Sequence, residues 1–484
     1  MTRESPQEPK EKQQEGLIAY LLQMVLWLMQ TVANLQEQLV QARAQQGQNS
    51  ANSSRPPSTD PPGAPARPRR RRSGRKRGGQ PGHPAQQRAL LPPERISQVV
   101  SLKPTGCRRC GGALQGEDAA PVRHQVIELP QVQATGVEYQ VHSLLCGRCQ
   151  IRTSAHLPPG VPRSGFGPRL QALVGVCSGA YRMSKRTVQQ LLLDLYQVPI
   201  SVGSICKLQR QTSEALAAPV AQVAQAVRQA PCAHADETSW RERGRKVWMW
   251  VVTLPQLAYF AIRPHRSRAV IKELLGAAWK GILTTDRYCV YSYLPIGQRQ
   301  LCWAHLLRDF LGMQQWAEAT KEVGAALYRQ GKRMFRLWHR VRDGTMSRAE
   351  FAQKVQPVQQ RVHQLLLQGA LLPIKKVART CRQLLKVEPA MWTFVQVHGL
   401  EPTNNEAERT VRPGVLMRKV SLGTQSAAGS RFVERMLTVT QSLRLQGRNV
   451  LHYVTLTCQS SLSGAAPPSL LPSVSTLPFP ALAA

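Results

Sequence analysis

The chain has 484 residues, 42% of them hydrophobic, and a formal net charge of +36. The hydrophobic fraction excludes a wholly disordered chain, and the length favours about three folded domains. So strong a positive charge indicates a polyanionic partner, and nucleic acid is the first expectation. The 11 cysteines include two close pairs, which favours an intracellular protein with a metal site over a disulfide scaffold.

The first predicted element is a helix over residues 17–45, in which apolar residues alternate by four and three. These residues are Leu21, Val25, Leu28, Val32, Leu35, Leu39 and Ala42. The pattern predicts a short coiled coil that pairs subunits; a helix packed on its own domain is the alternative. Gln23 and Gln30 interrupt the apolar run, which argues against a membrane span, and the polar first residues carry no secretory signal.

Residues 46–92 are rich in Asn, Ser, Pro, Gly and Arg, and we expect them to be disordered when free. They contain a dense run of cations, each of which can neutralise a phosphate. The run consists of Arg67, Arg69, Arg70, Arg71, Arg72, Arg75, Lys76 and Arg77. We interpret it as an arm that contacts DNA, with a solvated charge run as the alternative.

Residues 93–163 contain two CxxC knuckles separated by two strand-like segments, 122–129 and 137–145. The knuckle cysteines are Cys107, Cys110, Cys146 and Cys149. We expect a hairpin to bring the knuckles together, because four thiolates suit a closed, tetrahedral, structural Zn²⁺ site. Four unliganded thiols or a redox pair are the alternative.

Residues 164–230 are predicted to be helical, with helices over 182–196 and 201–217 and with Ser184 and Ser201 as N-caps. Their short connection is typical of a helix-turn-helix, although a purely structural helix pair is equally compatible with the pattern. The second helix would present to DNA the residues Lys207, Arg210 and Gln211.

From residue 232 the pattern predicts three strands, a helix and a further strand. These elements are expected at 234–236, 247–253, 257–262, 267–275 and 282–285. Asp236 and Asp286 end the first and last strands, which can lie side by side in such a sheet. Two carboxylates there would repel each other and raise a pKa unless a divalent cation lay between them. Two Mg²⁺ ions about 4 Å apart would suit phosphodiester cleavage.

A third carboxylate is expected from a later helix within residues 402–413, where Glu406 and Glu408 are the candidates. Residues two apart on a helix point about 200° apart, so only one of them can face the metals. Asn404 or Asn405 would cap this helix, and Pro413 would end or bend it. For each of these acids, a helix cap or a surface ion pair is the alternative.

Several segments, taken in order, resemble the bacterial transposases of the insertion-sequence-sixty-six family, the large DDE-type subunit. The resemblance covers about residues 17–455. It is carried by the paired CxxC knuckles and by NSSRPPSTD (52–60), RKRGGQPGHP (75–84), DETSW (236–240), TDRYCVYSYL (285–294), QLCWAHLLRDF (300–310), TNNEAERTVRP (403–413) and MRKVSLGTQSAAG (417–429).

We therefore expect a multidomain α+β chain, and the resemblance implies an RNase H-like α/β catalytic core with a helical insertion. The expected parts are a coiled coil (17–45), a disordered basic linker (46–92), a zinc-binding domain (93–163), a helix-turn-helix-like region (164–230), the core (231–310 and 401–455), its insertion (311–400) and a disordered tail (456–484).

The resemblance implies a catalytic triad of Asp236, Asp286 and Glu408, because Glu408 matches the family's Ala-Glu-Arg. For Cys302 and His305 it implies positioning near the core rather than metal ligation, with a packed helix start as the alternative. Nearby cations would bind phosphates beside the cut, with a solvated basic face as the alternative. These cations are Arg409, Arg412, Arg418 and Lys419.

The function implied is that of a cytoplasmic DNA transposase that binds the element's terminal repeats and target DNA. It would use Mg²⁺ or Mn²⁺ at the triad and Zn²⁺ at the knuckles, self-associate through the coiled coil, and work with two small accessory proteins encoded beside it. The alternative is a catalytically inactive DNA-binding repressor descended from a transposase. A coiled-coil scaffold that tethers zinc modules does not explain the predicted sheet.

Overall fold

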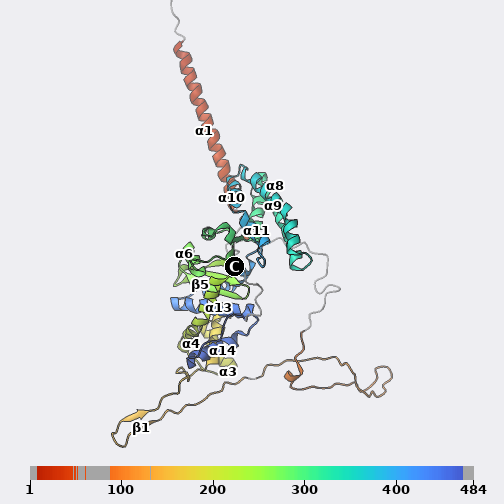
Figure 1. Cartoon of the computed structure of the whole chain (residues 1–484), viewed down its shortest axis with the longest axis vertical. Coiled ribbons are helices and arrows are strands. Elements are labelled where there is room, and N and C mark those ends of the chain that lie inside the picture. Colours follow the sequence, from red (N-terminus) through yellow and green to blue (C-terminus); the bar gives the residue numbers. More distant parts are fainter. Residues whose placement is uncertain are drawn as a thin grey trace, which may run out of the picture. The chain divides into compact units, whose positions relative to one another are not determined.

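The computed structural model describes residues 8–46, 48–50, 52, 60, 88–130 and 132–472 (Figure 1). The chain divides into two compact units. The smaller unit comprises residues 65–136 and 195–197, and the larger unit comprises the rest. The described part of the smaller unit contains the 3₁₀ turn Pro93–Arg95 and an antiparallel bridge between Gly106 and Ala113.

The main sheet has five strands in the order β5-β4-β3-β6-β7. The strands are β3 (Cys232–Glu242), β4 (Arg245–Leu254), β5 (Leu257–Arg263), β6 (Ile282–Thr285) and β7 (Arg299–Leu301). The first three form an antiparallel meander, while β6 runs parallel to β3 and β7 runs parallel to β6. The predicted order of strands and helix is confirmed, as is the adjacency of the first and last predicted strands.

β3 extends six residues further than the predicted end at 236, because its second half pairs with β4. Arg243 and Gly244 connect the two strands with φ angles of 51° and 76°. Positive φ at both residues is typical of the tight hairpin turn that matches strand twist. Helix α6 (Arg268–Leu275) then carries the chain from β5 to β6. The 3₁₀ turns Cys289–Tyr293 and Ile296–Gln298 connect β6 to β7.

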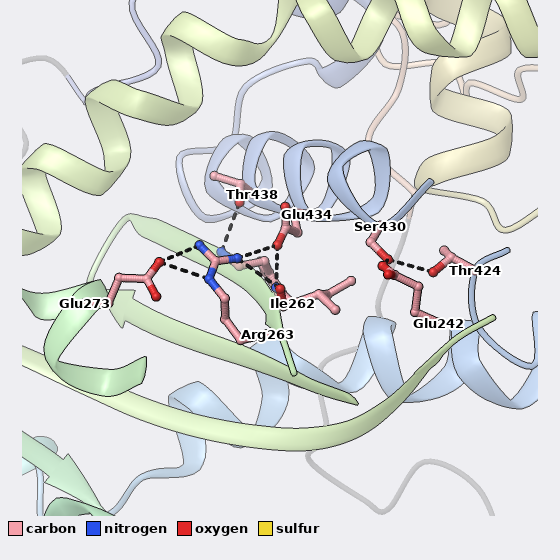
Figure 2. A network of polar contacts seen from close by, with 9 residues as sticks. Glu242, Ile262, Arg263, Glu273, Thr424, Ser430, Glu434 and Thr438 are labelled. Atoms are coloured by element: carbon pink, nitrogen blue, oxygen red, sulfur yellow. Dashed lines mark hydrogen bonds and ion pairs between the residues drawn. The ribbon is translucent and has the colours of Figure 1, made fainter. Parts of the chain in front are cut away.

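The free edge of β5 is covered by helix α13 (Ala427–Leu445), which accepts hydrogen bonds from the strand (Figure 2). The backbone amides of Ala258 and Phe260 donate to the hydroxyls of Ser442 and Thr438, each over 3.0 Å, and Ile262 donates to Glu434. Acceptors four apart on a helix are about 6 Å apart, which nearly matches alternate residues of a strand. The helix thereby satisfies an edge that would otherwise be open to pairing with another strand.

Further helices of the larger unit pack with this sheet into one hydrophobic core, which includes Trp240, Trp250 and Phe260. They are α2 (Pro168–Gly179), α4 (Val202–Ala215), α5 (Ala217–Gln229), α12 (Asn405–Ser421) and α14 (Val450–Ser463), while α3 (Lys185–Tyr196) contributes no residue to this core. Both predicted N-caps are confirmed: Ser184 Oγ accepts from the amide of Thr187, and Ser201 Oγ accepts from Ser204.

Five helices between β7 and α12 form a second hydrophobic core, so the predicted helical character of residues 311–400 is confirmed. They are α7 (Trp303–Trp316), α8 (Glu318–Arg342), α9 (Arg348–Ala370), α10 (Lys375–Lys386) and α11 (Pro389–Gln396). Aromatic rings fill this core, with ring centroids 4.7 Å apart for Trp303 and Trp392 and 5.1 Å apart for Trp338 and Phe394. Figure 1 shows α8, α9, α10 and α11 grouped together.

Helix α1 (Glu8–Gln46) contains the whole segment predicted to be helical, and its apolar seam is exposed. Leu21, Leu28 and Leu35 are 46%, 49% and 58% exposed. An exposed seam agrees with pairing between subunits, which stays a prediction. Among the described residues, one helical window, Glu15–Gln36, is long and apolar enough to cross a membrane, and a single such window near the N-terminus is weak evidence.

The expectations about local structure between the two knuckles were wrong. No strand forms at 122–129. The side chains there are almost all exposed, so they do not pack against another part of the described chain as a half-buried strand would. Of residues 137–145, only Ser143–Leu145 forms a strand, β1, which pairs with β2 (Arg152–Ser154). The hairpins therefore enclose each knuckle separately, since the Gly106–Ala113 bridge flanks the first and β1–β2 flanks the second.

The predicted disordered tail is ordered as far as residue 472. α14 continues to Ser463, Leu470 is fully buried, and the Tyr453 hydroxyl donates to Pro468 O over 2.7 Å. Residues 473–484 lie outside the described part of the chain. Pro413 also does not end its helix, because α12 runs on to Ser421. Proline has no backbone amide, so the helix loses one hydrogen bond there. Packing of the helix against the sheet compensates for this loss and lets the helix continue.

Candidate functional site

Asp236 and Asp286 lie at equivalent positions on neighbouring parallel strands. The last residue pair in the register of β3 with β6 is His234 with Thr284, and each aspartate comes two residues later. Burial raises the pKa of Asp236 well above its usual range, and the nearby Glu237, Asp286 and Glu408 raise it further. Burial likewise raises the pKa of Asp286. The sheet register therefore concentrates negative charge at one point of the larger unit.

Glu408 joins this cluster from the first turn of α12. Burial raises the pKa of Glu408, Arg308 opposes that shift, and Asp286 adds to it. Glu406, by contrast, has its pKa raised by burial and is influenced by Arg409 and Glu401 rather than by the two aspartates. The helical period thus directs Glu408, and not Glu406, toward Asp236 and Asp286.

Asn404 ties the three acid-bearing elements together. Its side chain is 1% exposed and donates from Nδ2 to Ala235 O, beside Asp236, over 2.7 Å. Its carbonyl accepts the amide of Glu408 at 3.1 Å, and its own amide donates to Cys302 Sγ at 3.2 Å. Asn404 is the residue preceding α12, as predicted for a cap, but its side chain makes no cap hydrogen bond and binds β3 instead.

Cys302 and His305 lie beside Glu408, at the start of α7. The amide of Cys302 donates to Thr285 O, the residue before Asp286, over 2.8 Å. Burial raises the pKa of the Cys302 thiol to about 11, so the thiol stays protonated while its sulfur accepts from Asn404. Burial lowers the pKa of His305 to about 3, with Arg308 contributing, so its imidazole is neutral.

Cys302, His305 and Glu408 each offer a ligand atom, and these atoms lie within 4.8 Å of one another. His305 Nδ1 and Arg308 Nη2 are each 3.5 Å from Glu408 Oε1. A soft metal could in principle use such a set. The role that the resemblance implied for Cys302 and His305, positioning near the core, stays a prediction.

A second acid beside Asp236 is neutralised by neighbours that the sequence did not identify. The side chain of Glu237 is 2% exposed, accepts from Arg266 Nε over 2.7 Å, and accepts from the hydroxyl of Tyr291. The Arg266 guanidinium lies 3.6 Å from the ring centroid of Tyr288. Strand alternation places Glu237 on the face opposite Asp236, a signal available in the sequence, whereas its cationic partner is 29 positions away.

Helix α7 also presents Arg308 and Asp309 near this cluster, and neither was identified as a site residue from the sequence. Arg287 donates to Asp309 Oδ2 from Nε over 3.0 Å and from Nη2 over 2.6 Å. The pKa of Asp309 is raised by burial, although Arg287 opposes the shift. The bidentate contact fixes the chain just after Asp286 against α7.

The cations predicted to contact DNA have different surroundings. Lys207 and Arg210 are exposed on α4, and Arg409, Arg412 and Lys419 are exposed on α12. Arg418 is instead half-buried and donates to the backbone carbonyl and hydroxyl of Ser239 on β3, so the structure gives it a structural partner. The basic arm falls outside the described residues, namely Arg67, Arg69, Arg70, Arg71, Arg72, Arg75, Lys76 and Arg77.

The two cysteine knuckles fall in different units, so their mutual arrangement stays a prediction. Within each knuckle the local geometry suits a metal-binding thiolate. Backbone amides of Arg109 and Cys110 lower the pKa of Cys107, and those of Cys149 and Arg148 lower the pKa of Cys146. All the described cysteines are free thiols. Amides directed at a sulfur favour its charged form, which is the form that binds zinc.

Comparison with known proteins identifies the family of the chain. Residues 163–431 match the transposase IS66 family, and residues 4–89 match a family of unknown function (DUF6444). The uncharacterized protein y4qI of Sinorhizobium fredii (strain NBRC 101917 / NGR234) is 26% identical over 238 residues, which are 44% of this chain and 43% of that protein. The chain thus matches less than half the length of this relative. Because the first match covers more than half of the chain and includes the acidic cluster, the chain belongs to the transposase IS66 family.

Proposed function

We propose that the chain is a DDE transposase that binds the terminal inverted repeats of an insertion sequence and catalyses DNA strand cleavage and strand transfer. The observation that carries the proposal is the proximity of Asp236, Asp286 and Glu408 at one partly buried point of a chain with a net charge of +36. A protein that only bound DNA would have no use for carboxylates that repel each other there. Strand order β5-β4-β3-β6-β7, antiparallel and then parallel, supports an RNase H-like core.

The residues present fit a divalent metal centre. Asp286 raises the pKa of both Asp236 and Glu408, so the three carboxylates form an oxygen-rich site whose repulsion a hard cation would relieve, and Mg²⁺ and Mn²⁺ both accept such ligands. When bound, a pair of these ions would supply charge stabilisation for the attacking and leaving oxygens of an in-line displacement. Asp236, Asp286 and Glu408 would be the protein ligands.

The chain's own groups then have distinct roles. Asn404 and Cys302 hold α12 to β3 and β6, which fixes Glu408 relative to both aspartates. Arg308 is 24% exposed and touches Glu408, so it can turn from that carboxylate to a DNA phosphate. The reaction proposed is hydrolysis of one strand at the element's end, which frees a 3′-hydroxyl, followed by attack of that hydroxyl on target DNA.

The remaining parts would hold the DNA and assemble the complex. The exposed cations of α4 and α12 and the basic arm would bind phosphates, and the knuckles would bind Zn²⁺ as a structural ion. Helix α1 would pair subunits through its exposed seam. We expect a cytoplasmic protein associated with DNA, assisted by two small accessory proteins encoded beside it.

The test is cleavage of DNA that carries the ends flanking this gene, with and without Mg²⁺, together with a gel-shift measurement of end binding. Asp286→Ala and Glu408→Ala should lose cleavage and keep binding. Glu406→Ala is the matched control, since it removes the same kind of carboxylate from the same helical turn, and it should remain active. Cleavage that persists in Asp286→Ala would refute the triad.

The repressor alternative has its own outcome in this experiment. Wild-type protein that binds the ends without cutting them, even with the accessory proteins added, would favour a DNA-binding descendant of a transposase.

A further inference from the structure

A short polar segment after α1 is buried although its residues are hydrophilic. Asn49, Ser50 and Asn52 are 9%, 7% and 7% exposed, in a stretch otherwise rich in serine and proline. Burying polar groups is unfavourable unless they are hydrogen-bonded, and ordering a linker costs conformational entropy. Such a segment stays buried only where specific contacts compensate for both costs.

The first set of contacts closes the segment on itself. The amide and hydroxyl of Ser50 donate to the two carboxylate oxygens of Asp60, over 2.6 Å and 2.7 Å. The amide of Asn49 donates to Asn52 Oδ1 over 2.8 Å, and the amide of Asn52 returns to Asn49 O over 3.3 Å. One carboxylate therefore joins two points that are ten positions apart, and a charged acceptor makes these bonds stronger than neutral ones.

The second set of contacts binds the segment to helix α7, which belongs to the same unit. Asn52 Nδ2 donates to Gln315 Oε1 over 2.7 Å. A Cβ atom added at Gly312 would lie 2.5 Å from the backbone oxygen of Asn52, closer than real side chains come. Glycine at position 312 is therefore what lets the segment's backbone reach the helix surface.

We propose that Asn49, Ser50, Asn52 and Asp60 form a docking clip, with Gly312 and Gln315 of α7 as its receptor. Its occupant is the chain's own segment, and the clip lies within residues 4–89, which match a family of unknown function. The clip would thus anchor this N-terminal module to the half of the chain that carries the acidic cluster. Gly312 follows His305 by seven residues on the same helix, roughly 10 Å along its axis. A displacement of α1 would therefore be transmitted through the clip to α7, the helix that contacts Glu408.

Amide hydrogen exchange on the full chain tests the clip without requiring any catalytic activity. The amides of Asn49 and Ser50 should exchange slowly in the wild type. Gly312→Ala should accelerate them roughly ten- to hundredfold, as expected when hydrogen bonds to a charged group are lost. Alanine is the better helix former, so the amides of α7 itself should keep their protection. Gly16→Ala is the matched control, because its added Cβ has no atom within 4 Å.

A second variant keeps the test independent of α7. Asp60→Ala removes the acceptor of both Ser50 bonds and lies outside the two hydrophobic cores, so it should accelerate the same amides and leave the sheet protected. Rapid exchange at Asn49 and Ser50 in the wild type would overturn the proposal. Exchange unchanged in both variants would overturn it as well. Protection that falls on dilution would also overturn it, since a second copy would then supply the clip.

Discussion

Asn404 is the residue whose replacement should most directly separate the assembly of the acidic cluster from the fold around it. Asn404→Ala removes the 2.7 Å hydrogen bond from Nδ2 to Ala235 O in a position that is 1% exposed. It leaves the backbone bonds to Cys302 and Glu408 available. Loss of one buried hydrogen bond costs about 1–3 kcal/mol. We therefore expect α12 to stay folded but to be held less tightly against β3.

Two measurements follow from this. Urea unfolding should show a loss of about 1–3 kcal/mol with an unchanged dependence on denaturant. If the chain cleaves DNA as proposed, the rate should fall more than end binding, because a displacement of about 1 Å at a reacting centre can cost roughly a hundredfold. Asn404→Asp keeps the shape but replaces the donor with a second acceptor, so it should be at least as damaging.

The control is the neighbouring Asn405→Ala, which changes the same residue type one position later at an exposed site. It should alter stability by no more than about 0.5 kcal/mol. Two results would contradict a stabilising role for the hydrogen bond from Asn404 to β3. One is an equal loss of unfolding free energy in Asn405→Ala and Asn404→Ala, and the other is an Asn404→Ala variant as stable as the wild type.

Three further predictions concern other parts of the molecule. Thr438→Val removes the hydroxyl that accepts the amide of Phe260 at the edge of β5, and it should lower the free energy of unfolding in urea by about 1–3 kcal/mol. The control Thr440→Val on the same helix should lower it less. Equal losses would contradict the role of α13 at that edge. Burial lowers the pKa of His234 from 6.5 to about 4, so the unfolded chain takes up a proton before the folded chain does as the pH falls. His234 alone should contribute a loss of about 3 kcal/mol between these pH values, while the carboxyl groups of raised pKa act in the opposite direction. The free energy of unfolding of the wild type should therefore fall by about that amount relative to His234→Gln, and a difference that does not change with pH would refute the assignment. The knuckle cysteines should hold one Zn²⁺ per chain, measured by metal analysis and released by a chelator, and Cys146→Ser should abolish it; full retention of zinc in that variant would exclude the four-thiolate site.

Local sequence patterns predicted most of the secondary structure. The heptad seam predicted the helix that became α1, and Ser184 and Ser201 marked two helix starts correctly, because capping depends on residues within one turn. The predicted order of three strands, a helix and a further strand also indicated that the strands of Asp236 and Asp286 could be neighbours, which is confirmed. Errors arose where a local pattern found no tertiary partner, as at 122–129, or found an unforeseen one, as in the tail that packs through Leu470.

The identity of the acids was available from the sequence, whereas the way they are held was not. Nothing in the order of residues indicates that Asn404 binds Ala235, that Arg266 neutralises Glu237, or that Gly312 admits the backbone of Asn52. Each of these contacts joins residues far apart in the chain. They depend on which faces the two hydrophobic cores bring together.

By itself, the sequence determined the family, the types of element and the acids that carry the proposed chemistry, since motifs, periodicity and capping are properties of short segments. Only the tertiary structure decided that Asn404 binds β3 and so holds the start of α12, and that Arg418 binds Ser239. The reason is geometric: the facing of a helix is set by its packing against the sheet, and that packing depends on the volumes and contacts of side chains from the whole chain.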